Sequence, residues 1–380
     1  MTCPCCKESA RFVDHRPKTF VSLLGVIRFK RGYYHCADCH QGQFPWDKTL
    51  RLSPQSLTLA AQEVVALAGS NESFCKVADR TLEKMSGLRL SESTVERTTE
   101  AAGERVGELL EAGEVFGKPC MWKWNRDQSG KTCGYISVDA TGIMMQGPDG
   151  AKADGRMVNV GMVFNPQRRA VDEKAIAKPC DGVRYQAGLC TLAQLGERLR
   201  RQAAQVGMND VDQWIALSDA GQGLEHFFDV YFPRAVKILD FRHATDHLAP
   251  LAKRLRPGQA GDELLSAWCH QLKHEGGTVL LNVLEKLDRD QMDEPTRAEH
   301  NGVLTYYRNH CARMNYPEYL KQGWQIGSGG VESACKNVIN QRLNMGGMRW
   351  GEAGGNAMAN LRALLRSDAD QWDNFWAVAA

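Results

Sequence analysis

Two apolar segments decide the fold: Tyr135-Ile-Ser-Val-Asp139 and Trp214-Ile-Ala-Leu-Ser-Asp219. Each has the length and apolar content of a buried β-strand, and each ends in a carboxylate. Residues 157–164 are also apolar and predict a second strand after the first. A third strand is expected near residues 170–178, and a helix near residues 189–205 leads toward the Trp214 strand.

A helix over residues 224–232 and a strand over residues 235–240 complete the order β-β-β-α-β-α-β. This order, with an aspartate at the end of the first and fourth strands, is the ribonuclease-H arrangement. If these two strands pair at the centre of the sheet, Asp139 and Asp219 lie side by side at one edge. The sequence therefore predicts an α/β fold with a ribonuclease-H-like mixed sheet as its core.

A third carboxylate is expected from a later helix in this arrangement. The segment Ile326-Gly-Ser-Gly-Gly-Val-Glu332-Ser-Ala-Cys-Lys336 has a glycine-rich entry and places Glu332 in the first helical turn. Asp139, Asp219 and Glu332 could hold two Mg²⁺ or Mn²⁺ ions, which clamp the attacking and leaving oxygens of a phosphoryl transfer. Lys336 follows Glu332 by one turn and either pairs with it or faces a DNA phosphate. We favour phosphate, because metal should occupy Glu332.

The strings around these acids resemble one family. Val-Asp139-Ala-Thr-Gly, Leu-Ser-Asp219-Ala-Gly-Gln-Gly-Leu, Ile-Leu-Asp240-Phe-Arg-His243 and the Glu332 segment are similar to bacterial insertion-sequence transposases of the ISKra type, which are Mutator-like DDE enzymes. The resemblance covers nearly the whole chain. It implies Mg²⁺-dependent DNA cleavage and strand transfer at the ends of an insertion sequence, with Asp139, Asp219 and Glu332 as the metal ligands.

The resemblance also bears on residues near these acids. Asp240-x-x-His243 resembles the signature C/D-x-x-H of the group, and we interpret it as supporting the metal ligands or contacting DNA, not as binding zinc. Lys336 and Arg342 are given the same interpretation. Two alternatives remain: a catalytically idle DNA-binding regulator derived from a transposase, and a ribonuclease-H-like nuclease that does not join strands.

Two cysteine pairs open the chain, Cys3-Pro-Cys-Cys6 and Cys36-Ala-Asp-Cys39. Each C-x-x-C pair can present two thiolates from a tight turn, so the four side chains predict a structural zinc site, with Cys5 as a substitute ligand. The segment between them predicts a β-hairpin that turns near Gly25, and together these features indicate a zinc ribbon. One face of the hairpin is basic and is expected to contact DNA through Arg28, Lys30 and Arg31.

A helical segment follows. Ser53-Pro54 predicts a helix start, a second helix begins at Ser73 and ends near Gly87, and a third is capped by Ser91 or Ser93. Two helices joined by a short turn containing glycine are typical of a helix-turn-helix. The expected DNA contacts of the last helix are Ser93, Thr94 and Arg97. The alternative is a helical linker or dimerisation element.

About 80 residues after His243 are helix-like and exceed what the basic fold needs. The resemblance to the transposases implies that they form a helical insertion that grips DNA near the cut. The expected domains are a zinc ribbon (1–50), a helical helix-turn-helix-like domain (51–115), the first part of the core (116–247), the helical insertion (248–325) and the second part of the core (326–380).

Composition narrows the class of protein. The chain has 380 residues with a net charge of +2, 43% hydrophobic residues and 13 cysteines. Ordinary apolar content excludes a mainly disordered chain, and no apolar run reaches the roughly 20 residues that span a bilayer. With no apolar leader and an odd cysteine count, we expect a reduced cytoplasmic protein at the bacterial nucleoid.

Positive and negative residues are concentrated in different segments of the chain. Residues 1–60 carry nine Lys and Arg against four Asp and Glu, a sum of +5, and residues 301–350 carry six against two, a sum of +4. The other 270 residues therefore sum to −7. A basic segment on a near-neutral chain indicates a nucleic-acid partner. We expect double-stranded DNA, and a homodimer or larger assembly, because two DNA ends must be brought together.

Overall fold

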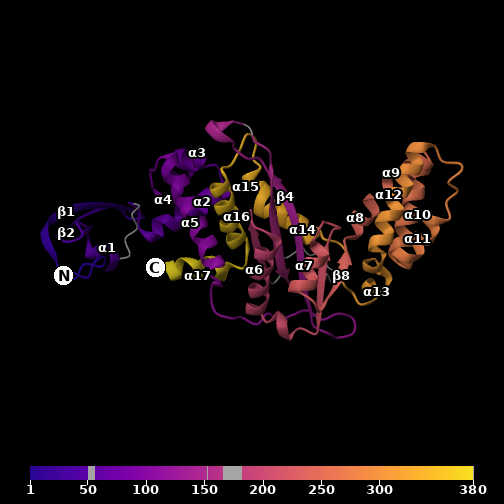
Figure 1. The fold of residues 1–380 in the computed structure, drawn as a ribbon, viewed down its shortest axis with the longest axis horizontal. Coiled ribbons are helices and arrows are strands. Elements are labelled where there is room, and N and C mark those ends of the chain that lie inside the picture. Colours follow the sequence, from indigo (N-terminus) through magenta and orange to yellow (C-terminus); the bar gives the residue numbers. More distant parts are fainter. Residues whose placement is uncertain (50–55, 152, 166–181, 380) are drawn as a thin grey trace.

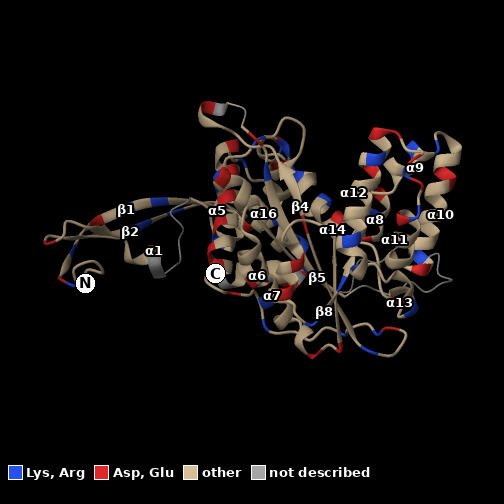
Figure 2. Cartoon of the chain, turned by 45° about the vertical axis from the view of Figure 1, so that its right-hand side comes forward, with Lys and Arg blue, Asp and Glu red and all other residues tan. Residues whose placement is uncertain are grey.

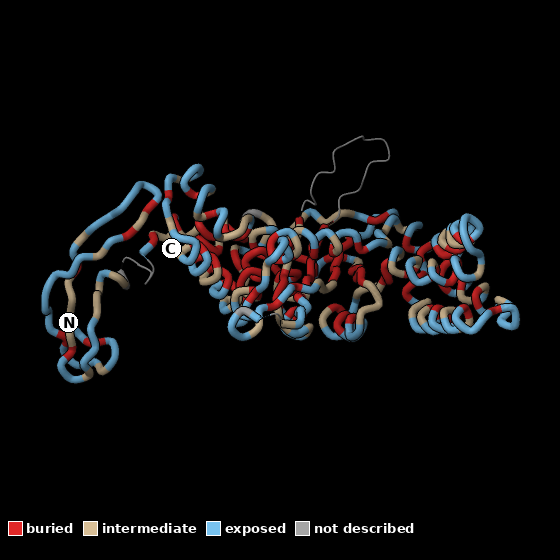
Figure 3. Tube along the Cα trace, turned by 90° about the horizontal axis from the view of Figure 1, so that it is seen from above, coloured by how far each residue is buried: buried red, intermediate tan, exposed pale blue. Residues whose placement is uncertain are grey.

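The computed structural model describes residues 1–49, 56–151, 153–165 and 182–379. Along its longest axis the molecule has a hairpin at one end, a central sheet covered by helices, and a group of helices at the other end (Figure 1). The hairpin is largely exposed, whereas buried residues fill the centre of the molecule (Figure 3).

A five-stranded sheet in the order β6-β5-β4-β7-β8 forms the centre. β5 is antiparallel to β4 and β6, whereas β7 is parallel to both β4 and β8. The strands are β4 (Cys133–Ile143), β5 (Arg156–Phe164), β6 (Val183–Gly188), β7 (Gln213–Ser218) and β8 (Ala235–Leu239). The predicted α/β class with a mixed sheet is confirmed. The strand expected near residues 170–178 falls largely among residues 166–181, outside the described part.

The side chains of β4 alternate between two cores, as the period of two in a strand requires. Ile136 and Val138 pack with helices α6 and α7 on one face of the sheet. Cys133 and Tyr135 belong to the core on the opposite face, which includes residues of the segment that carries Glu332. The elements on the two faces are α6 (Leu192–Gln205) and α7 (Leu224–Tyr231), and α14 (Gly329–Ala334), the π-helical η5 (Cys335–Asn340), α15 (Gln341–Leu343) and α16 (Glu352–Arg366).

A helical unit lies between the hairpin and the sheet. Gly87 has a left-handed φ of 71° and ends the second helix, and Ser91 is the N-cap of the third, as predicted. The helix start expected at Ser53-Pro54 lies outside the described residues. The elements are α2 (Leu59–Asn71), α3 (Phe74–Lys76), the π-helical η1 (Val77–Thr81), α4 (Leu82–Ser86) and α5 (Glu92–Glu111).

The C-terminal helices join this unit to the sheet. α16 packs against α5 and β6, and α17 (Ala369–Ala379) packs on α16 and α2. The contact with α5 is close at Gly103, because a Cβ there would lie 2.1 Å from the carbonyl oxygen of Ala357. The C-terminal helices α16 and α17 therefore hold the helical unit against the sheet.

The N-terminal hairpin consists of β1 (Ala10–Ser22) and β2 (Gly25–Cys36), which are antiparallel, with the short β3 (Gly42–Gln43) beside β2. It is longer than the segment expected from sequence, but it turns at the predicted Gly25. Val21 forms a bridge to Leu57, which ties the hairpin to the helical unit. The short helix α1 (Pro45–Thr49) follows β3.

A group of helices at the far end of the molecule follows β8. It includes residues 248–325, which were predicted from sequence to form a helical insertion. Trp268, Leu272 and Leu280 are buried among its helices. Its elements are α8 (Phe241–Asp246), α9 (Ala249–Leu255), α10 (Gln259–Glu275), α11 (Gly277–Glu285), α12 (Glu294–His310), the 3-10 turn η4 (Cys311–Arg313) and α13 (Tyr316–Lys321). Two further 3-10 turns are η2 (Pro148–Gly150) and η3 (Met208–Asp210). Among the described residues, every helix is too short or too polar to span a bilayer.

Candidate functional site

Four cysteine thiols meet in the N-terminal module. The Sγ atoms of Cys3, Cys6, Cys36 and Cys39 all lie within 4.8 Å of one another, and the pairs Cys3–Cys39 and Cys6–Cys36 are 3.5 Å apart. A tetrahedral zinc site with Zn–S distances of about 2.3 Å has S–S edges of about 3.8 Å, so the cluster could bind zinc. Cys5 is exposed and outside the cluster, so its expected role as a substitute ligand is wrong.

The two cysteine turns share one backbone path. Lys7 and His40 each follow the first cysteine of their turn by four residues, and both have a left-handed φ, of 66° and 56°. The amide of Lys7 donates to the carbonyl oxygen of Cys3 over 3.0 Å. A hydrogen bond from the backbone of Cys6 is the largest cause that lowers the pKa of the Cys3 thiol, to about 7. This hydrogen bond favours the thiolate of Cys3. At Cys6 and Cys39 a backbone hydrogen bond also lowers the pKa, but burial and hydrogen bonds with neighbouring thiols outweigh it and raise the pKa of both.

Asp139 lies in β4, and Asp219 directly follows the neighbouring parallel strand β7. The β4–β7 register pairs Ser137 with Leu217, so continuing it by two residues sets Asp139 opposite Asp219. Parallel strands lie about 4.8 Å apart, and residues in register point to the same side. Both aspartates therefore lie on the sheet face of Tyr135 and Leu217, the face that carries α14 and η5.

Asp139 is the more enclosed of the two carboxylates. Its Oδ1 accepts the amide of Ala140 over 2.7 Å, and its Oδ2 lies 3.5 Å from the Sγ of Cys335. Burial is the largest cause that raises the pKa of Asp139, and the negative charge of Asp219 raises it further. The Oδ1 of Asp219 accepts the amide of Gly221 over 2.8 Å. A cation bound to this pair of acids would therefore neutralise the negative charges of Asp139 and Asp219.

Glu332 lies in the first turn of α14, as predicted, and α14 packs against β4 and β5. Its carboxylate is 4.0 Å from the Nη1 of Arg242. Both Asp139 and Glu332 raise the pKa of the Cys335 thiol, after burial as the largest cause. Cys335 therefore contacts Asp139 and also experiences the charge of Glu332.

The structure also forms a compact group that the sequence did not predict as a set. Ligand atoms of Asp240, His243 and Glu332 all lie within 4.8 Å of one another. Asp139 and Asp219 belong to neither such group among the described residues. The three acids predicted as one set thus fall into two neighbouring subsets, the strand pair and the group around Glu332.

Asp240 anchors this second subset. Its side chain is 1% exposed, its Oδ1 accepts the amide of His243 over 2.8 Å at the start of α8, and its Oδ2 accepts the amide of Ser328. Burial alone would raise its pKa, but the hydrogen bonds from Ser328 and His243 outweigh burial and lower it. Asp240 therefore fastens the loop before α14 to the end of β8. Ser328 and Arg242 were missed in sequence analysis, although an aspartate just before a helix is a typical N-cap.

Two predicted DNA contacts are wrong because their side chains are buried. Arg342 is 0% exposed, its Nε donates to the carbonyl oxygen of Gly69 over 2.9 Å, and its guanidinium stacks near Phe74 and Trp350. Arg31 is also buried, with Asp47 as its ion-pair partner.

Lys336 is exposed. Within the described part of the chain it forms no ion pair with Glu332, so a role in contacting DNA stays a prediction.

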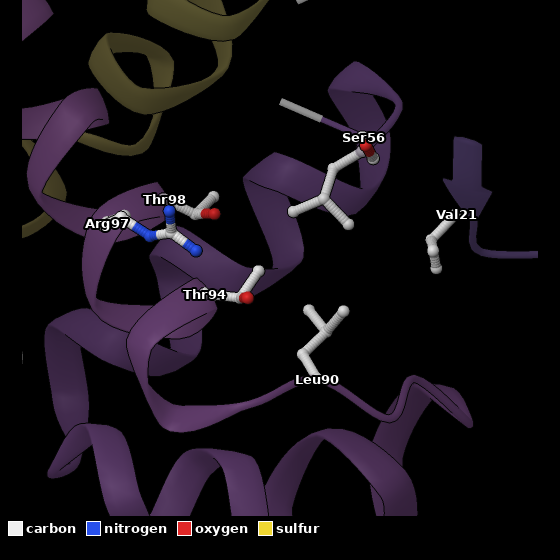
Figure 4. Close-up of a pocket in the computed structure, with 7 residues that line it drawn as sticks. Val21, Ser56, Leu90, Thr94, Arg97 and Thr98 are labelled. Carbon is white, nitrogen blue, oxygen red and sulfur yellow. The ribbon is translucent and has the colours of Figure 1, made fainter. Parts of the chain in front are cut away.

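Two of the three predicted recognition residues, Thr94 and Arg97, border a cavity of about 470 Å³, whereas Ser93 does not line it. Thr94, Arg97 and Thr98 of α5 lie on one side, and Val21 of the hairpin lies across from them (Figure 4). The Nε of Arg97 donates to the carbonyl oxygen of Ser93 over 3.0 Å, which holds the side chain along the helix. Ser93 and Arg97 are exposed. The cavity therefore joins two elements for which DNA contacts were predicted separately.

Charged residues are distributed unevenly along the chain (Figure 2). Arg28 and Lys30 are exposed on β2 and keep the hairpin basic. A stripe of α5 is acidic instead, and it borders a separate cavity of about 690 Å³ lined by, among others, Glu100, Glu104, Glu108 and Glu111. The basic character predicted for the chain start therefore lies on the hairpin and does not extend along α5.

Comparison with known proteins gives no relative for this chain: no family model matches it, and no curated protein matches it. The geometry of the two acid subsets and of the four thiols is thus the basis on which a function can be argued. The strand pair and Glu332 could take part in chemistry on phosphate, because carboxylates that converge on one sheet edge suit hard divalent cations.

Proposed function

We propose that this protein is a DDE transposase, which cleaves DNA at the ends of an insertion sequence and joins those ends to target DNA. One observation carries the proposal: Asp219 directly follows β7, and the β4–β7 register, which ends at Ser137 and Leu217, would set it opposite Asp139 if continued by two residues. A lone aspartate at a strand end is commonly a turn cap. Two on neighbouring strands, with Glu332 on the helix α14 that packs against β4 and β5, favour a metal-dependent site.

The topology supports the finer fold assignment within this proposal. Three antiparallel strands in sequence, β4, β5 and β6, are followed by two that run parallel to β4, with α6 and α7 between them. Written in sequence order within the sheet, the strand order is 3-2-1-4-5, which is the ribonuclease-H arrangement. The helical group between β8 and α14 is then the insertion that separates the first two acids from the third.

Mg²⁺ is the ion that the proposal implies, and the residues fit it, because burial and, to a smaller extent, the negative charge of Asp219 raise the pKa of Asp139, and a cation there would offset both. Asp139, Asp219 and Glu332 would hold it, and when bound it would activate a hydroxyl nucleophile and stabilise the leaving oxygen. Asp240 would act on the site indirectly, by fixing the loop that begins α14 through Ser328.

The remaining elements suit binding to double-stranded DNA. The exposed Arg28 and Lys30 on the hairpin and the exposed Arg97 on α5 could contact phosphates on neighbouring surfaces, with the 470 Å³ cavity between the two elements. Four thiols would keep the end of the hairpin folded around zinc. Because a strand-transfer reaction joins two element ends, a homodimer or larger assembly is part of the proposal.

The test uses the full chain, Mg²⁺ or Mn²⁺, and a labelled DNA that carries the ends of the element encoding the protein. The proposal expects nicks that leave 3′-hydroxyl groups, followed by joined products. Asp139→Asn and Asp219→Asn should each abolish both products. Asp154→Asn is the control, because Asp154 is an exposed acid on the β4–β5 connection and should leave the reaction unchanged.

The same experiment separates the alternatives. DNA binding without cleavage would support a regulator derived from a transposase. Cleavage without joining, at many positions, would support a nuclease. Cleavage by Asp139→Asn at the rate of the parent protein would contradict the site assignment itself.

A further inference from the structure

Asp240, His243 and Glu332 come from three places in the chain: the end of β8, the first turn of α8 and the first turn of α14. Their ligand atoms lie within 4.8 Å of one another. We propose that they form a binding site for one divalent transition-metal ion of the Mn²⁺ type, with one imidazole nitrogen and two carboxylate oxygens as ligands. This site is distinct from the pair formed by Asp139 and Asp219.

An orphaned nitrogen points to the ligand. The side chain of His243 is 41% exposed, but its Nδ1 atom is buried, forms no hydrogen bond among the described residues, and lies 3.5 Å from the Oδ1 of Asp240. A buried imidazole nitrogen normally has a partner, since leaving one unpaired costs free energy. A metal ion between this nitrogen and the carboxylates would supply the missing interaction.

The carboxylates of Asp240 and Glu332 still have lone pairs available to bind a metal ion. Each oxygen of Asp240 accepts one backbone amide, from His243 or Ser328, and each carboxylate oxygen has two lone pairs. These amides also fix the orientation of the side chain, which is how a rigid metal site is built. Glu332 is only loosely paired, with the Nη1 of Arg242 at 4.0 Å, and is partly exposed, so an ion from solvent can reach it.

The ligand set selects the class of metal. Mg²⁺ prefers oxygen ligands alone, whereas an imidazole with two carboxylates suits Mn²⁺, Fe²⁺ or Zn²⁺. Thiol ligands select Zn²⁺, and the nearest thiol, Cys335, lies beside Asp139 and not in this group. Mn²⁺ is therefore the probe of choice, because the four-cysteine site should not compete for it.

The proposed site does not depend on the transposase function, although it shares Glu332 with the acids of that proposal. Metal binding can be measured on the full chain without DNA, and strand transfer can be measured separately. A protein that binds Mn²⁺ through His243 but joins no DNA would retain this inference and contradict the proposed function. The reverse result would retain the function and contradict the inference.

The experiment measures Mn²⁺ bound to the full chain, freed of divalent ions by resin treatment that leaves the cysteine-bound zinc in place. Pulsed electron paramagnetic resonance should detect ¹⁴N coupling from a directly bound imidazole. His243→Gln should abolish the coupling and weaken Mn²⁺ binding by about tenfold or more. The matched control is His247→Gln, one turn farther along, where the ring is exposed and stacks on Tyr306, and it should keep both the coupling and the affinity.

Two results would overturn the inference. Absence of ¹⁴N coupling in the parent protein at saturating Mn²⁺ would exclude an imidazole ligand, and this result needs no variant to fold. Coupling that survives in His243→Gln but disappears in His247→Gln would place the ion elsewhere. Thermal unfolding of both variants shows whether any loss of binding comes from loss of the fold.

Discussion

The Nε of Arg342 donates a hydrogen bond over 2.9 Å to the carbonyl oxygen of Gly69, a residue 273 positions earlier in the chain. Next to it, the buried guanidinium of Arg362 donates to carbonyl oxygens of Ser70 and Val338. The end of α2 is thereby tied to η5, the segment that continues directly from the helix carrying Glu332. A helical unit predicted to bind DNA and a helix predicted to hold metal are therefore mechanically linked.

Replacing Arg342 should destabilise the protein. Arg342→Met removes the hydrogen bond to Gly69 and leaves that carbonyl unpaired in the interior, which costs about 2 kcal/mol. Burial lowers the pKa of Arg342 to about 10, so the group is still charged at neutral pH and its loss is not offset by titration. Urea unfolding measures the change in the free energy of unfolding. Arg349→Met is the control, because Arg349 is exposed and should shift stability by less than about 0.5 kcal/mol.

The strands were predictable because their signal is local. Tyr135–Val138 and Trp214–Ser218 are apolar runs followed by an aspartate. A short apolar run of this kind is enough to predict a strand that is buried in a sheet. The burial of Arg342 and Arg31 was not predictable from sequence, where an arginine is expected to be exposed and free to contact DNA. Their partners, the carbonyl of Gly69 and the carboxylate of Asp47, are brought close only by tertiary packing.

The four-cysteine cluster, which could bind zinc, gives a prediction with a control in the first cysteine turn. Cys36→Ser should lose the bound zinc and unfold the end of the hairpin, because a module of this size has little core of its own. Cys5→Ser should keep the zinc, since Cys5 is exposed and outside the cluster. Zinc content per chain and protease cleavage of the first 45 or so residues are the measurements. Equal zinc loss in both variants would contradict the assignment.

The acid site was predictable in part. Asp219 directly follows β7, as predicted, whereas β4 continues past Asp139 to Ile143, so the strand end expected at Asp139 is wrong. The sheet topology still brings the two residues to neighbouring strands. Asp240 and His243 are three apart on one helix start and share a face by helical spacing alone. The approach of Glu332 to that face depends on where the chain returns after the helical group of α9 to α13, and local sequence contains no information on that return.

Stability should depend on pH through Asp139 when divalent metal is absent. Burial and the charge of Asp219 raise its pKa in the folded state, so folded Asp139 holds its proton to higher pH than the unfolded chain does. Its contribution to stability is therefore present at low pH and is lost as pH rises through the folded pKa.

Asp139→Asn, which has no charge at any pH, should consequently raise the melting temperature at about pH 8 more than at about pH 4. Saturating Mn²⁺ should reduce the difference at high pH, because the ion stabilises the parent protein by binding its folded state. Melting curves across this range, with and without Mn²⁺, test the expectation. If the melting temperatures of Asp139→Asn and the parent differed by the same amount at every pH, the charge of Asp139 would not destabilise the folded state.

Arg97 should contribute one phosphate contact to DNA binding. It is exposed at the mouth of the cavity between α5 and the hairpin, with its Nε fixed on the carbonyl oxygen of Ser93. Loss of one phosphate contact releases about one counterion fewer, so Arg97→Ala should reduce the slope of log K against log salt by about 0.9. Arg105→Ala is the control, because Arg105 is exposed two turns farther along α5 and does not line the cavity. Fluorescence anisotropy with duplex DNA at several salt concentrations measures both slopes. If Arg105→Ala lowers the slope and Arg97→Ala does not, DNA follows a different face of α5 from the one that borders the cavity.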